Sequence, residues 1–128
     1  MSIEIDTRGV SIVIRAEGER EYLELRMQGK LHHRDYQVMI PVIERAIEAA
    51  GEKELDLLVD MREFEGWSFE AALDDMRFGF KIKDKFKKIA VVGTKKWEEI
   101  SVELFRHFAR GEMRFFTDIE AAREWILS

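Results

Sequence analysis

Hydrophobic and polar residues alternate along this 128-residue chain in a way that predicts strands and helices in turn. A period of two, or a short unbroken apolar run, is typical of a strand, and apolar residues at i, i+3, i+4 and i+7 are typical of a helix. Strand patterns occupy six segments: Ile3–Ile5, Val10–Ala16, Tyr22–Met27, Leu55–Met61, Ile89–Val92 and Met113–Phe116. Helical patterns occupy four: His33–Ala50, Ser68–Lys83, Lys95–Arg110 and the segment after Thr117. This order predicts an α/β fold with a mixed, centrally parallel β-sheet and about four helices, in a single domain over residues 1–128.

Turn and capping residues place the ends of several elements. Glu17–Glu19 contains a glycine and is expected to form the turn of an antiparallel hairpin. Gly51 is a C-terminal stop for the first long helix, and Pro41 lies either in the first turn of the regular helix or at a kink in a longer one. Thr117 and Glu120 have the spacing of a capping box, which predicts that Thr117 caps the last helix.

The helix at Ser68–Lys83 is apolar on two sides. We expect one stripe to face the core: Phe69, Leu73, Met76 and Phe80. The opposite side carries three apolar residues, and a fourth if the helix extends backwards: Ala71, Phe78, Ile82 and Trp67. An outer helix normally has one apolar stripe, so a second buried surface is needed. Four candidates for covering this second side are open: the Lys95–Arg110 helix, a protein partner or homodimer, a hydrophobic ligand, or a bilayer interface.

Charge is distributed unevenly. The segment from Arg77 to Lys96 carries +7, and the rest of the chain brings the net charge to −5. A basic patch beside an apolar ridge favours an anionic surface or partner, and the alternative is a solvated helix end and loop. Nucleic acid is not expected, because the net charge is acidic and no recognised nucleic-acid motif is present.

Candidate chemistry is sparse. The chain has no cysteine, and its three histidines lack zinc-site spacing, so we expect no metal, no cofactor and no catalytic site. Asp60 near a strand end is a weakly supported base. The turn before Lys95 and Lys96 opens a helix, so its free amides and these two lysines are candidates for holding a phosphate or carboxylate. The alternative there is an ordinary turn capped by Thr94.

Four segments taken together resemble the SpoIIAA-like family, which has the fold of STAS domains. They are GKLHHRDY at Gly29–Tyr36, LLVDMREFEGWS at Leu57–Ser68, KKIAVVGTKKWE at Lys87–Glu98 and EMRFFTDIEAAREWI at Glu112–Ile126. Anti-sigma-factor antagonists of this fold are phosphorylated on a serine in an Asp-Ser-Ser-Gly-like turn. Ser68 alone remains here, as a phosphorylation candidate whose other role is to cap the helix. The fold is also similar to that of the lipid-binding CRAL-TRIO domains, which implies hydrophobic-ligand or membrane association by analogy only.

The sequence therefore predicts a cytoplasmic, non-enzymatic binding module, with peripheral membrane association as one option. A hydrophobic or lipid-like ligand, or a membrane surface, would lie against the helices 68–83 and 95–110. The residues expected to bind it are Trp67, Phe78, Ile82, Lys95, Lys96, Trp97 and Phe105. The alternative is a protein-interaction domain in signalling, similar to anti-sigma-factor antagonists but without their phosphoserine motif.

Overall fold

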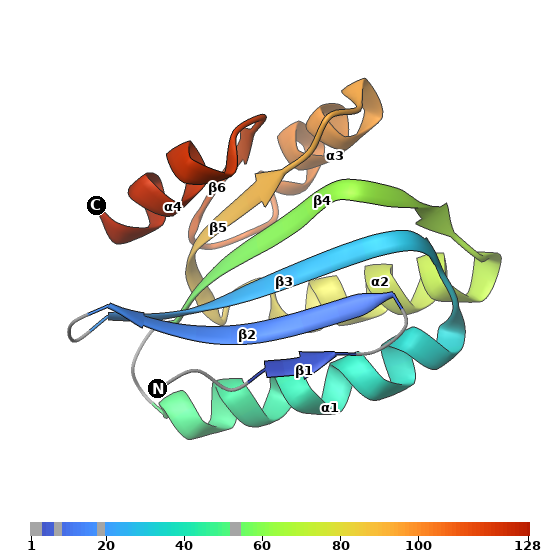
Figure 1. Cartoon of the computed structure of the whole chain (residues 1–128), viewed down its shortest axis with the longest axis horizontal. Coiled ribbons are helices and arrows are strands. Elements are labelled where there is room, and N and C mark those ends of the chain that lie inside the picture. The colour runs from blue at the N-terminus through green and yellow to red at the C-terminus, as the bar shows by residue number, and fades with distance from the viewer. Residues whose placement is uncertain (1–3, 7–8, 18–19, 52–54) are drawn as a thin grey trace.

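The computed structural model describes residues 4–6, 9–17, 20–51 and 55–128, and six strands in these ranges form one sheet in sequence order. The strands are β1 (Glu4–Asp6), β2 (Val10–Glu17), β3 (Arg20–Leu31), β4 (Leu55–Trp67), β5 (Phe86–Val92) and β6 (Glu112–Phe116). The helices are α1 (His33–Ala50), α2 (Phe69–Ile82), α3 (Lys96–Phe105) and α4 (Ile119–Leu127) (Figure 1). Residues 18 and 19 of the predicted hairpin turn lie outside the described residues.

The sheet has an antiparallel part and a parallel part. β1, β2 and β3 pair antiparallel, whereas β3 to β6 pair parallel, so the predicted mixed α/β fold is confirmed. β3 and β4 are longer than predicted, because their parallel pairing continues through two register shifts to Leu31 and Trp67. β6 lies at one edge of the sheet, as predicted.

The two faces of the sheet carry different helices. One face holds the larger core, to which α1, α2 and α3 contribute, and Figure 1 shows α1 and α2 lying along the same side of the sheet. Side chains alternate between faces with a period of two, so the neighbours of these core residues point the other way. Leu58 and Ala90 accordingly pack in a second cluster with Ala122 and Ile126 of α4.

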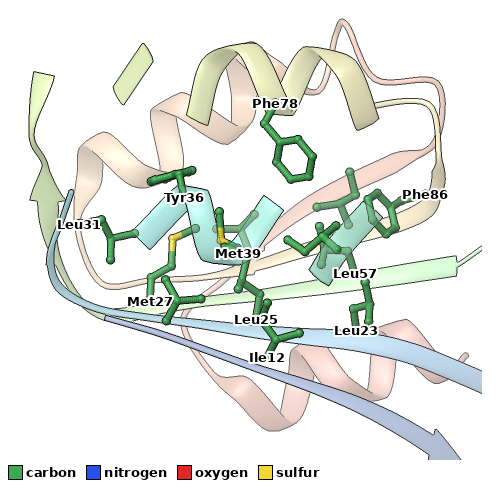
Figure 2. Close-up of a cluster of buried hydrophobic side chains, with 14 of the residues drawn as sticks. Ile12, Leu23, Leu25, Met27, Leu31, Tyr36, Met39, Leu57, Phe78 and Phe86 are labelled. Carbon is green, nitrogen blue, oxygen red and sulfur yellow. The ribbon is translucent and has the colours of Figure 1, made fainter. Parts of the chain in front are cut away.

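The side of α2 that packs on the sheet is opposite to the predicted one. Ala71 and Phe78 are buried and Ile82 is partly buried in the larger core. Figure 2 shows the ring of Phe78 pointing from α2 toward the sheet. Three residues of the stripe expected to form the core are exposed, by 80%, 58% and 46%: Phe69, Met76 and Phe80. That expectation is wrong, because Ala71 presents only a methyl group and lets its own side of the helix approach the sheet.

α1 spans the predicted range. Gly51 ends it with a φ of 62°, a conformation that favours glycine, and its amide donates to the Glu48 carbonyl at 3.1 Å. Pro41 lies inside the helix and not in its first turn.

Two helix ends differ from the predicted ones. α3 ends at Phe105 and does not continue to Arg110. The cap of α4 is Asp118, whose carboxylate accepts from the Ala121 amide at 3.1 Å, so the assignment of the cap to Thr117 is wrong by one residue. Both residue types cap helices well, and the spacing alone did not distinguish them.

Candidate functional site

A cavity of about 400 Å³ lies between the sheet and the helices α2 and α3. Its floor consists of aliphatic side chains from β3, β4 and β5, among them Leu25, Leu57, Val59, Ile89 and Val91. Its walls include Ala72, Phe78 and Gly79 of α2 and Val102 and Phe105 of α3. Small-molecule sites typically enclose about 300–1,000 Å³ and are mostly apolar with a few polar groups, so both the size and the lining suit a small hydrophobic ligand.

Methionines are concentrated around the cavity. Five of the six methionines in the chain line it: Met27, Met39, Met61, Met76 and Met113. The sixth, Met1, lies outside the described residues. The methionine side chain is unbranched and polarisable, so it adapts to irregular partners. The lining can therefore adjust to ligands of different shape.

Aromatic side chains connect α3 to α2 and to the end of β4 beside the cavity. The ring centroids of Phe80 and Phe105 lie 5.7 Å apart, and those of Trp67 and Trp97 lie 5.6 Å apart, both edge to face. Met76, Phe80 and Trp97 line the cavity and are also exposed to solvent, so they form its rim. The cavity therefore opens to solvent between side chains of α2 and α3.

One wall carries a chain of hydrogen bonds among residues distant in sequence. The indole Nε1 of Trp67 donates to the Tyr36 hydroxyl at 2.6 Å, and that hydroxyl donates to Asp75 Oδ1 at 2.8 Å. Burial raises the pKa of Asp75, although the Tyr36 hydrogen bond partly opposes this rise. Burial also raises the pKa of Tyr36, and the Asp75 charge adds to that rise. Trp67 and Asp75 line the cavity, so this chain fixes part of its shape.

Glu98 is the most buried carboxylate on the cavity lining. Its side chain reaches back over the start of α3, where Oε1 accepts from the amides of Thr94 and Lys95 at 3.1 Å and 3.0 Å. A Cβ atom at Gly93 would lie 2.5 Å from this oxygen, so glycine leaves the space that the carboxylate occupies. The amides expected to be free for a phosphate or carboxylate are thus bonded to a carboxylate of the chain itself.

The structure brings together most of the predicted site residues. Five line the cavity: Trp67, Phe78, Ile82, Trp97 and Phe105. Lys95 and Lys96 lie outside it, since Lys95 Nζ donates to the Phe64 carbonyl and Lys96 Nζ donates to Glu99 at 2.7 Å. That these residues bind a ligand stays a prediction.

Other members of the basic segment also bond within the chain. Lys81 pairs with Glu44 and Lys83 with Asp84, each at 2.8 Å. The ammonium of Lys88, a largely buried residue, donates to carbonyl oxygens in the last turn of α4. Much of the positive charge seen in the sequence is therefore compensated locally.

Asp60 lies on the opposite face of the sheet from the cavity, between the lining residues Val59 and Met61. Its two oxygens accept from Arg62 Nε and Nη2, each at 2.9 Å. Burial would raise the pKa of Asp60, but the bonds from Arg62 outweigh it and lower that pKa. A carboxylate held in this way is a structural ion-pair partner and a weak base.

A second hollow, of about 770 Å³ and more open to solvent than the cavity, lies where α1 and α2 begin. It is lined by His33, Ser68 and Glu70, among others. Ser68 caps α2, with Oγ accepting from the Ala71 amide at 3.2 Å; its phosphorylation stays a prediction. The His33 ring contacts Asp74 at 2.5 Å, and this hydrogen bond raises the pKa of His33. No pattern in the sequence indicates this pairing, because the two residues lie on different helices.

The described part of the chain contains no group of three or more histidine, aspartate or glutamate side chains arranged to hold a metal ion. No helix in those ranges combines the length and the hydropathy needed to cross a bilayer.

Comparison with known proteins identifies the family. The SpoIIAA-like family model matches residues 22–127. The structure is similar to the crystal structure of an uncharacterized protein of the DUF3478 family, with a SpoIIAA-like fold, from Shewanella loihica PV-4. The two chains share 32% sequence identity and superpose with a TM-score of 0.83, and the match covers 97% of this chain and 98% of that one. No curated protein matches the sequence of this chain. The resemblance seen in four sequence segments is thereby confirmed, and the chain belongs to the SpoIIAA-like family.

Proposed function

We propose that this protein is a non-enzymatic binding module that holds a small hydrophobic molecule between the sheet and helices α2 and α3. The observation that carries the proposal is the apolar, methionine-rich cavity of about 400 Å³. Protein interiors are normally packed as densely as organic crystals, with few voids larger than a water molecule. An apolar space of this size that opens to solvent between two helices is typical of a binding site.

The rim supports access to this space. Met76, Phe80 and Trp97 lie at the surface and contribute to the lining, so an apolar molecule would meet hydrophobic side chains before it enters. Burial of a ligand is worth roughly 25 cal/mol per Å² of apolar area removed from water.

Binding of a simple apolar probe tests the proposal. Decyl methyl ether has a flexible chain and one weak acceptor, and Trp67 and Trp97 report its arrival by fluorescence because both line the cavity. We expect saturable binding of one molecule per chain. Ala72→Phe would place a ring inside the cavity and weaken binding at least about tenfold, whereas Ala49→Phe, on an exposed site of α1, would not. Urea unfolding of both variants verifies that they fold, and absence of saturable binding to the wild-type protein refutes the proposal.

A second candidate function is protein interaction in signalling. Several large apolar side chains are exposed on α2, on α3 and just after it: Phe69, Met76, Phe80, Ile100, Leu104 and Phe108. Exposed apolar groups clustered on neighbouring elements are typical of interaction surfaces. Pull-down from a native extract with wild-type and Ile100→Asp protein tests this candidate, and equal recovery of every protein by the two would contradict it. Membrane-surface association and a homodimer are further outcomes that liposome flotation and sedimentation would detect.

A further inference from the structure

One oxygen of Glu98 lacks a hydrogen-bond partner within the part of the chain that the structure describes. The residue is 2% exposed, and Oε2 is buried without a donor among the described residues. Buried polar side-chain atoms are paired in the large majority of cases, and an unpaired acceptor destabilises the folded protein. Oε2 therefore needs an explanation beyond the capping of α3.

The carboxylate is held in place by its other oxygen. Oε1 accepts from two amides, so rotation of the group to find a donor for Oε2 would break two existing hydrogen bonds. The start of a helix accounts for Oε1, because the first amides of a helix have no partner within it. It does not account for Oε2, and Glu98 also lines the cavity.

We infer that the ligand of the cavity carries a hydrogen-bond donor, a primary amine or a hydroxyl, which bonds to Glu98 Oε2. The inference rests on the proposed function, since it presupposes a ligand in that cavity. A hydrophobic chain would occupy the space over the sheet, and its donor would complete the coordination of the carboxylate. A hydrogen bond to a charged group is stronger than one between neutral groups.

The charge around the cavity favours a donor over an anion. A second carboxyl group, that of Asp75, also lines the cavity. Lys83 is on the lining as well, but its ammonium bonds to Asp84 at 2.8 Å. The lysines expected from the sequence to hold an anionic head group, Lys95 and Lys96, bond elsewhere.

A pair of probes of equal chain length tests the inference. Decylamine, used below its micelle concentration, carries a donor, whereas decyl methyl ether does not. We expect the wild-type protein to bind the amine at least about tenfold more tightly than the ether, as a hydrogen bond to a charged acceptor implies. Equal affinity for the two probes would overturn the inference and leave the proposed function intact. Absence of ether and amine binding alike would overturn both.

Two variants separate the hydrogen bond from general charge. Glu98→Gln keeps an oxygen that can accept from the two amides but replaces the unpaired acceptor with an NH₂ group, so the preference for the amine should disappear. Glu99→Gln removes the same charge from the partly exposed neighbour that pairs with Lys96, and the preference should persist. Ether affinity in each variant reports whether the cavity is intact. A preference that survives Glu98→Gln, or that is lost equally in Glu99→Gln, would contradict the assignment.

Discussion

The variant Tyr36→Phe removes the hydroxyl that links α1 to the cavity wall. Tyr36 is fully buried, and its hydroxyl both accepts from Trp67 and donates to Asp75. Loss of the oxygen leaves both partners without that bond. A buried group left unpaired costs about 1–3 kcal/mol. Because Trp67 and Asp75 are only partly buried, the cost for each lies in the lower half of this range, and we expect a loss of about 2–4 kcal/mol in the free energy of unfolding.

Urea unfolding followed by tryptophan fluorescence measures this loss, with the m-value as the check that the unfolding transition is unchanged. Asp75→Asn is the matched variant, because its amide oxygen still accepts from the Tyr36 hydroxyl. The double variant closes a thermodynamic cycle whose coupling energy isolates what the Asp75 charge adds to the Tyr36–Asp75 hydrogen bond, since an oxygen acceptor remains in Asp75→Asn. A loss below about 0.5 kcal/mol in Tyr36→Phe would fall within the range of ordinary surface substitutions and would refute the assignment of this hydroxyl as a link between the two helices.

The same pair predicts a pH dependence. Burial raises the pKa of Asp75 in the folded protein, partly offset by the Tyr36 hydrogen bond. A group whose folded pKa is raised binds protons more tightly when folded, so its favourable contribution is complete at acidic pH and is lost as pH rises through the folded pKa. The stability of the wild-type protein relative to Asp75→Asn should therefore fall as pH rises from the ordinary carboxyl range. A difference that is independent of pH would contradict the burial of this carboxyl.

Three further predictions concern single sites. Gly79→Ala should stabilise the protein by about 0.5–1 kcal/mol in urea unfolding, because glycine is a poor helix former and an added Cβ would meet its nearest neighbour at 3.7 Å, an ordinary contact; destabilisation would show that the glycine is needed for packing. By NMR titration His33 should have a pKa above the ordinary histidine value, because its hydrogen bond to Asp74 favours the charged ring. Asp74→Asn should lower that pKa. The stability that His33 contributes should be complete below pH 6.5 and be lost as pH rises through the folded pKa. Asp118→Ala should cost about 1 kcal/mol by loss of the α4 cap, whereas Thr117→Ala should cost less; the reverse order would restore Thr117 as the cap.

The order of elements was predictable because each has a strong local signal. The alternation at Tyr22–Met27, the short apolar runs at Leu55–Met61 and Ile89–Val92, and the helical spacing at His33–Ala50 all match elements of the structure. The ends of β3 and β4 were not predictable, because pairing between the strands continues past the hydrophobic runs into charged positions such as Glu63. Long-range pairing decides such ends.

The cavity was predictable only in part. Two apolar stripes on one helix indicated a second buried surface, and Trp67, Phe78 and Phe105 do line a common space. The pattern contained no information on which stripe faces the sheet, because both are apolar; the small Ala71 decides it by close approach. Glu98 resembled any charged residue on a helix surface, and its position as the third residue of α3 was the one available signal of a cap.

The central claim, that a hydrophobic molecule occupies the space under α2 and α3, is tested most directly by NMR of methyl groups during titration with decyl methyl ether. The methyl resonances of Met27, Met61 and Met113 on the sheet side of the cavity should shift together along one saturable curve, whereas those of Leu58 and Ile126, in the cluster under α4, should remain in place. Shifts of equal size on both faces of the sheet, or no saturable shift of the methionines, would contradict the proposal.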